Sequence, residues 1–316
     1  MQSIVIIKII FKMKKKKYFL IPLITLVAAC APHVYVATQP PPPPQPAPVQ
    51  VTVQAVAPPN SYQVFYDALG PYGRWIDYPG EGYVWVPNLG PDFRPYATNG
   101  HWVYSDAGWT WVSGYNWGWA PFHYGRWFFE AGYGWMWLPG HQWAPAWVTW
   151  GRSGNYFGWA PVAPHINIEE HSWSPPENTW TFVPAEHITH ENVVNYAVNN
   201  KTVINNTTIV KNVTVINNIT NNKVVNNNVT NNVTDNNVTN KTTNVVYNRG
   251  PEVNEVENVS NIKIQKVTIN EKAEPGAAIV NANKLMVYRP VIKQTVNSGE
   301  RKPAPVRVEQ YHKAGQ

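Results

Sequence analysis

The chain has 316 residues, with 16 tryptophans, 29 prolines and a single cysteine. Its formal net charge of +6 arises near the N-terminus, because six of the 25 basic residues precede Cys30 and all 19 acidic residues follow it. Residues 61–164 contain four arginines, six carboxylates and no lysine. Nucleic-acid binding needs clustered cations that displace counterions from phosphates, so this composition argues against a nucleic-acid partner. One cysteine allows no intrachain disulfide, and the fold must rest on its core.

The N-terminal segment has the order of features of an export signal. Lys14–Lys17 precede the apolar run Tyr18–Val27, and the small residues Ala28 and Ala29 come directly before Cys30. This arrangement resembles the lipobox of bacterial lipoproteins, which implies that residues 1–29 are a signal peptide and that Cys30 is lipidated. The alternative is an ordinary membrane anchor with an incidental cysteine, but the apolar run is shorter than the roughly 20 residues of a span.

Two further residues refine this prediction. Met13 begins a complete signal by itself, so we expect it to be the true start. Ala31, rather than aspartate, follows Cys30. By resemblance to lipoprotein sorting in enteric bacteria, this favours an outer-membrane location. Several acyl chains give stable anchoring, so the membrane is an expected partner.

Residues 30–60 form a proline-rich linker. Pro40–Pro44 favour the extended polyproline II conformation, which suits a semi-rigid stalk between membrane and domain. The alternative is a ligand for a proline-binding groove.

A repeat occupies residues 61–164. Each copy begins with Gly-Arg-Trp or Gly-His-Trp and continues to a second tryptophan, and the starts are 27 and 25 residues apart. The copies run from Gly73 to Trp85, from Gly100 to Trp111 and from Gly125 to Trp137. Aromatic residues alternate with small ones between glycine-containing turns, which predicts one β-hairpin per copy. We therefore predict an all-β fold, with three Trp-rich hairpins forming a small sheet or barrel-like domain.

The motifs in this region resemble an uncharacterised family of exported bacterial domains. The resemblance rests on Tyr66-x-x-Leu69-x-Pro71-Tyr72-Gly73-x-Trp75 and on Trp117-Gly118-Trp119-Ala120-Pro121-x-His123-Tyr124-Gly125-Arg126-Trp127. That family carries a Tyr-x-Trp-Gly-x-Trp repeat and occurs in proline-rich exported and FecR-associated proteins. The resemblance implies an envelope location and an all-β repeat domain over about residues 61–164, and it supplies no ligand or catalytic residue.

The remaining sequence divides by composition. After a connecting segment, 165–185, residues 186–248 are rich in Asn, Val and Thr, with Thr-Val-Ile-like triplets every six residues from Thr202. We expect a flexible, β-prone tract that is cut first by proteases, between about residues 192 and 249; the alternative is a β-solenoid. Residues 249–297 predict a small unit that could dock on the first, with a helix at 253–259 and strands at 262–269 and 284–293. Residues 298–316 predict a flexible tail.

Catalytic and metal-binding patterns are weak. His101, His123 and His141 recur in the repeats and could converge on a metal, but histidine also serves as a polar edge residue in such hairpins. The six carboxylates could include a glycosidase pair across a cleft, although Asp106 lies in a turn-like string. We predict no enzyme, no metal and no cofactor.

The tryptophans leave two interpretations open. They either fill a thin β core or stack on glycan rings at an exposed surface. The candidate stacking residues are Trp75, Trp85, Trp102, Trp111, Trp127 and Trp137. The first function hypothesis is a non-enzymatic outer-membrane lipoprotein with a structural or interaction role, with envelope proteins among its partners. The alternative is a glycan-binding module for peptidoglycan or a surface polysaccharide.

Overall fold

The computed structural model describes residues 61–169, 173–217, 244–293 and 302–314, all within one compact unit that spans residues 53–316. The predicted signal peptide, Cys30, the linker and residues 218–243 of the Asn-rich tract lie outside the described residues.

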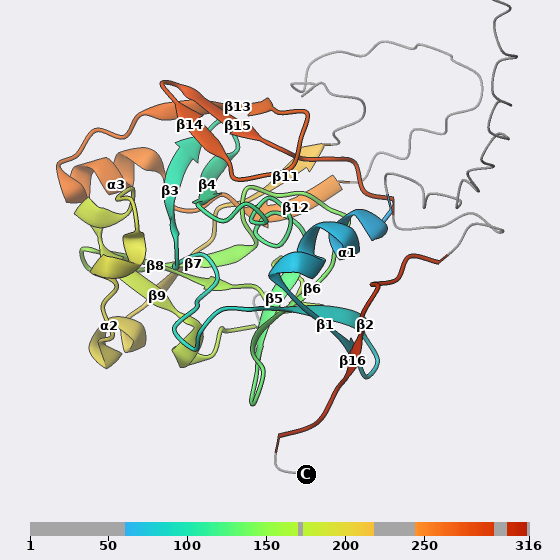
Figure 1. Cartoon of the computed structure of the whole chain (residues 1–316). Helices are drawn as coiled ribbons and strands as arrows, with labels where there is room; N and C mark the ends of the chain where they lie inside the picture. Colours follow the sequence, from blue (N-terminus) through green and yellow to red (C-terminus); the bar gives the residue numbers. More distant parts are fainter. Residues whose placement is uncertain (1–60, 170–172, 218–243, 294–301, 315–316) are drawn as a thin grey trace, which may run out of the picture. The chain divides into compact units, whose positions relative to one another are not determined.

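The described chain consists mainly of short strands (Figure 1). The helices are α1 (Gln63–Leu69), η1 (Gly70–Tyr72), η2 (Glu177–Thr179), η3 (Ala185–His187), η4 (Val193–Tyr196), α2 (Lys201–Asn205) and α3 (Val253–Ser260). The first eight strands are β1 (Gly73–Tyr78), β2 (Gly82–Pro87), β3 (Gly100–Ser105), β4 (Gly108–Ser113), β5 (Arg126–Glu130), β6 (Gly134–Leu138), β7 (Val148–Ser153) and β8 (Tyr156–Pro161). The others are β9 (Thr181–Pro184), β10 (Thr208–Val210), β11 (Val213–Asn217), β12 (Asn244–Asn248), β13 (Lys266–Glu271), β14 (Ile279–Asn281), β15 (Lys284–Val287) and β16 (Glu309–Gln310).

The predicted all-β fold is confirmed, and it contains four Trp-rich hairpins rather than three. Each hairpin places two tryptophans directly opposite each other on adjacent strands. The pairs are Trp75 with Trp85, Trp102 with Trp111, Trp127 with Trp137, and Trp150 with Trp159. The fourth hairpin escapes the sequence repeat because it has Val148, not glycine, two residues before its first tryptophan.

The glycine of the repeat has a steric role. In the first three hairpins the ring of the returning tryptophan lies directly over this glycine, where any side chain would collide with it. An added methyl group would lie 2.4 Å from Trp85 at Gly73, 2.4 Å from Trp111 at Gly100, and 2.8 Å from Trp137 at Gly125. The Gly-x-Trp motif is therefore a packing requirement of the paired indoles.

The sheets are open, and no described set of strands closes into a barrel. The first and third hairpins share one sheet, of order β16-β1-β2-β6-β5, because Trp85 on β2 pairs with Trp137 on β6. The second hairpin belongs to a sheet of order β14-β15-β13-β3-β4, and the fourth to one of order β10-β7-β8-β9. The barrel-like alternative is thus wrong for the described residues.

Strands from beyond residue 164 complete these sheets. β16 pairs in parallel with β1, and β13 pairs in parallel with β3 (Figure 1). β10 and β9 pair antiparallel with β7 and β8, so the segment expected only to connect contains a strand. The C-terminal part therefore docks on the Trp-rich hairpins by continuing their backbone ladders.

The hexad triplets of the Asn-rich tract take three different structures. Thr202-Val203-Ile204 lies in α2, Thr208-Ile209-Val210 forms β10, and Thr214-Val215-Ile216 lies in β11. β10 pairs with β7 whereas β11 pairs with β12, so these three triplets do not stack as a solenoid.

Two predictions for the C-terminal part need correction, while the helix at 253–259 is confirmed as α3. The first strand is shifted, at 266–271 instead of 262–269, and the second is shorter, at 284–287 instead of 284–293. Residues 302–314, expected to be flexible, lie along the first and third hairpins, and Tyr311 packs on Tyr78 at a ring distance of 4.7 Å. We call residues 302–314 the tail strap.

Candidate functional site

All six tryptophans expected to form a stacking surface are buried. Trp75 is 3% exposed, Trp127 is 1%, and the other four are fully enclosed. Each indole contacts other rings, as Trp102 does with Trp150 at 4.6 Å. The prediction of an exposed stacking surface is wrong for these residues, because their cross-strand pairs face the interior. Of all 16 tryptophans, only Trp135 and Trp173 are as much as partly exposed.

The indole N–H groups of the six divide into two sets. Three donate to backbone carbonyl oxygens: Trp85 to Leu69 at 3.1 Å, Trp127 to Pro121 at 2.8 Å, and Trp137 to Tyr124 at 2.7 Å. The other three are buried with no hydrogen-bond partner among the described residues, namely Trp75, Trp102 and Trp111. A buried donor without an acceptor lowers the stability of the fold, so these three indoles are positions where an additional acceptor would be favourable.

Trp75 lines a cavity of about 610 Å³, which we call the tail cleft. One wall is formed by α1, η1 and the start of β1, and the other by residues 306–309 of the tail strap. The lining side chains and backbone come from Tyr66, Asp67, Gly70, Pro71, Gly73, Arg74, Trp75, Val306, Arg307, Val308 and Glu309. Its volume falls within the roughly 300–1,000 Å³ that is usual for small-molecule sites.

The tail strap is held on both sides of the cleft. Before it, the side-chain amide of Gln63 donates to the carbonyl oxygen of Ala304 and accepts from its N–H, both at 3.1 Å. At the cleft itself, Arg74 Nη1 lies 3.0 Å from Glu309 Oε2, and both side chains are exposed to solvent. The strap thus bridges the cleft between two attachments.

Tyr311 fixes the far end of the strap. Its hydroxyl donates to Glu130 Oε1 at 2.9 Å, and its ring stacks on Tyr133 at 5.4 Å. The hydrogen bond to the Glu130 carboxylate, with burial and nearby charge, raises the pKa of Tyr311 to about 12. The backbone N–H of His312 donates to the Tyr133 hydroxyl at 2.7 Å.

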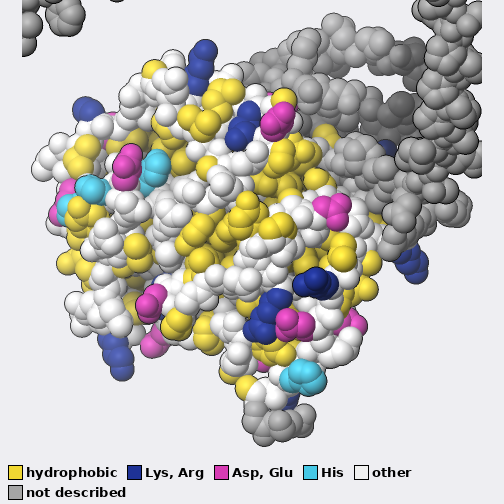
Figure 2. Space-filling model, viewed as in Figure 1, with side chains coloured by type: hydrophobic (Ala, Val, Ile, Leu, Met, Phe, Trp, Pro, Cys, Tyr) yellow, Lys and Arg dark blue, Asp and Glu magenta, His cyan; other side chains and the backbone are white. Residues whose placement is uncertain are grey.

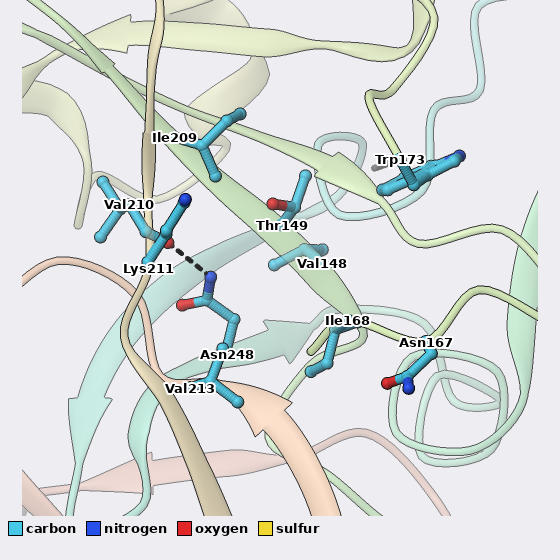
Figure 3. A pocket seen from close by; sticks show the side chains of 10 residues that line it. All are labelled: Val148, Thr149, Asn167, Ile168, Trp173, Ile209, Val210, Lys211, Val213 and Asn248. Atoms are coloured by element: carbon cyan, nitrogen blue, oxygen red, sulfur yellow. Dashed lines mark hydrogen bonds between the residues drawn. The ribbon is translucent and has the colours of Figure 1, made fainter. Parts of the chain in front are cut away.

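A second, smaller pocket of about 80 Å³ lies at the start of β7. Figure 3 shows Ile209 and Trp173 on opposite sides of Thr149. Asn248 donates from its amide to the carbonyl oxygen of Val210 at 2.7 Å, which closes the pocket towards β10. Its volume is well below that of a usual ligand site.

Of the three predicted histidines, His123 lies in the core, whereas His101 and His141 are half-buried. His123 is 2% exposed, stacks on Trp143 at 5.4 Å, and places Nδ1 3.1 Å from the carbonyl oxygen of Ala144. Burial lowers its pKa to about 4, and burial also lowers the pKa of His101 and of His141. Within the described ranges, no three His, Cys, Asp or Glu side chains gather in a way that could hold a metal.

Several of the six carboxylates have structural contacts. Asp106 lies in the β3–β4 turn and accepts from the N–H of Ile269 at 3.3 Å, which ties β13 to that turn. Glu81 pairs with His165 at 2.8 Å, and Glu130 accepts from the Tyr311 hydroxyl. Asp67 lines the tail cleft and accepts from the amide of Gln63 at 2.8 Å.

Charge is dispersed over the molecule. On the face seen in Figure 2, basic and acidic side chains are interspersed among hydrophobic and uncharged ones, without a large area of one sign. In the part of the chain that the structure describes, no helix has the length and hydrophobicity to cross a membrane.

Sequence reasoning missed the tail strap and therefore the cleft. The signal was present in residues 306–311, Val-Arg-Val-Glu-Gln-Tyr, where β-branched or aromatic residues alternate with polar ones over most of the segment. Trp75 is the one predicted stacking residue that lines this cleft, and the other five tryptophans lie in the core.

The fold and the cleft define an all-β domain of Trp-rich hairpins completed by C-terminal strands. Residues 66–166, about a third of the chain, match a family described as a family of unknown function (DUF6600). This agrees with the resemblance to an uncharacterised domain. Searches of curated proteins and of solved structures found no match.

Proposed function

We propose that the protein is a lipid-anchored protein of the bacterial outer membrane with a non-enzymatic, structural or interaction role. The observation that carries this proposal is the basic cluster, apolar run and Val27-Ala28-Ala29-Cys30 at the start of the chain. Acyl chains on Cys30 would supply the several lipid signals that stable anchoring needs. The proline-rich linker would then hold the hairpin domain away from the membrane.

Processing and fractionation test the anchor. Globomycin, which blocks lipoprotein signal cleavage, should make the precursor accumulate, and Cys30→Ser should release the protein from the membrane fraction. Ala37→Ser, a comparably small change beyond the cysteine, serves as the matched control and should leave the protein in the outer-membrane fraction. Unchanged processing under globomycin together with membrane retention of Cys30→Ser would refute the proposal.

A second candidate function is glycan binding, and the tail cleft favours it. The cleft combines aromatic side chains with both donors and acceptors of hydrogen bonds, as sugar sites require. The purified full chain should sediment with isolated sacculi or respond to soluble glycans in calorimetry. A flat response across a broad glycan panel would remove this candidate and leave the anchored, structural role standing.

A further inference from the structure

We propose that the tail cleft is the sugar-binding site and that it takes a short, neutral oligosaccharide. This inference rests on the glycan-binding candidate above and adds the site and the ligand class.

Two aromatic side chains, Tyr66 and Trp75, belong to the inner wall. Tyr66 and Trp75 meet edge to face at a centroid distance of 4.7 Å, and they are 8% and 3% exposed. The buried N–H of Trp75 has no acceptor among the described residues. A sugar hydroxyl would provide the oxygen that this enclosed N–H lacks once the surrounding side chains shift to admit it, and the accessible edges of the two rings would contact sugar C–H groups.

The charged groups in the cleft favour a neutral ligand. Arg74 and Arg307 line it together with Asp67 and Glu309, two cations and two carboxylates. A ligand of either net charge would meet like charges as often as opposite ones. Sugar hydroxyls both donate and accept, so they can satisfy carboxylates and guanidinium groups at once.

The exposed ion pair of the outer wall can yield to a ligand at small cost. Residues 306–309 form this wall, and Val306 is 91% exposed. The Arg74–Glu309 pair that spans the cleft is open to solvent, with side chains 41% and 54% exposed. Exposed ion pairs contribute little stability, so sugar hydroxyls can replace this contact.

The test is calorimetric titration of the purified full chain with short chito-, cello- and malto-oligosaccharides as neutral probes. Arg307→Ala and Trp75→Phe should each weaken binding about tenfold, the loss expected when a polar contact worth about 1.4 kcal/mol is removed. Arg307 is exposed, so its substitution reports on binding even if Trp75→Phe disturbs folding. Trp173→Ala, in the pocket of Figure 3, is the matched control and should bind like the unmodified chain.

The possible results distinguish the assignment of the cleft from the glycan-binding candidate itself. Full binding by both cleft variants, or loss of binding in Trp173→Ala alone, would overturn the assignment to the cleft while glycan binding stood. Tighter binding of oligogalacturonate than of the neutral probes would overturn the ligand class. No binding of any glycan by the unmodified chain would overturn both the inference and the glycan-binding candidate.

Discussion

Burial of His123 should make the fold sensitive to mild acid. The imidazole is enclosed between Trp143 and the backbone of Ala144, and desolvation lowers its pKa from 6.5 to about 4. Arg289, whose guanidinium lies 5.2 Å from the Trp143 ring centroid, adds positive charge nearby and contributes a small part of this lowering. The carbonyl oxygen of Ala144 can only accept, which places the proton of the neutral ring on Nδ1.

The sign of the effect follows from linkage. A histidine with a depressed folded pKa stabilises the fold above its unfolded pKa of 6.5, and this stabilisation is lost as pH falls towards about 4. At about pH 5 the imidazole is mostly protonated in the unfolded state and mostly neutral in the folded state, which lowers the free energy of unfolding by about 2 kcal/mol. Below pH 4 the loss approaches about 3 kcal/mol, since each pKa unit corresponds to about 1.4 kcal/mol.

The assay is urea unfolding followed by tryptophan fluorescence at about pH 7.5 and about pH 5, for the unmodified chain and for His123→Asn. Asparagine keeps a neutral N–H donor for Ala144 and does not titrate. The variant should be less stable at both pH values because it loses the ring contact with Trp143. Between the two pH values, however, the unmodified chain should lose about 2 kcal/mol more than the variant. Equal losses, within about 0.5 kcal/mol, would show that His123 does not carry the acid sensitivity.

Three further perturbations test the packing. Gly100→Ala should lower the free energy of unfolding by about 1–3 kcal/mol, because its methyl group would lie 2.4 Å from the Trp111 ring. Gly90→Ala, in open space, should change that free energy by less than about 0.5 kcal/mol in chemical unfolding. Equal effects of the two substitutions would contradict the steric role of the repeat glycine. Tyr311→Phe, which removes the hydrogen bond to Glu130, should speed amide exchange across residues 304–312 relative to the unmodified chain, and unchanged exchange would show that the hydroxyl does not hold the strap. A chain ending at residue 164 lacks β9, β10, β13 and β16 and should aggregate or lose its near-ultraviolet circular dichroism, whereas a soluble, cooperatively unfolding fragment would show that these strands are dispensable.

The hairpins were predictable because they depend on local pattern. Alternating side chains and glycine-containing turns fix a hairpin within about 15 residues of sequence. The Gly-x-Trp signature marked three hairpins, since in each a glycine must admit the opposite indole. The fourth hairpin pairs Trp150 with Trp159 in the same way but starts from Val148. It therefore resembles the other three in strand register but lacks their Gly-x-Trp motif.

The Asn-rich tract shows where local pattern is insufficient. Similar triplets, each a threonine followed by two β-branched residues, form part of a helix at Thr202, an edge strand at Thr208 and a strand of a two-stranded sheet at Thr214. β-Branched residues favour strands only when a partner strand is available. β10 has that partner in β7, whereas the α2 triplet buries Val203 beside Phe182 and Trp180 instead. The local sequence therefore favours helix and strand to a similar degree at these triplets, and the neighbouring strands and side chains determine which one forms.

The same physics explains why the cleft could not be read from the tryptophans. Cross-strand indole pairs make a strong sequence signal because they determine the core, and burial in the core removes all of the six predicted tryptophans except Trp75 from any ligand. Strand edges give no such signal, because the ladder bonds that cover them come from the backbone of any residue with an extended conformation. β16 covers the edge of β1 with only two residue pairs, from a segment about 230 residues away in sequence. The cleft arises at this junction, where a wall made by α1, η1 and the start of β1 meets a strand supplied by the tail. A search for function in this fold is therefore best directed at the covered hairpin edges, where residues such as Arg74 and Arg307 remain accessible, rather than at the tryptophan repeat.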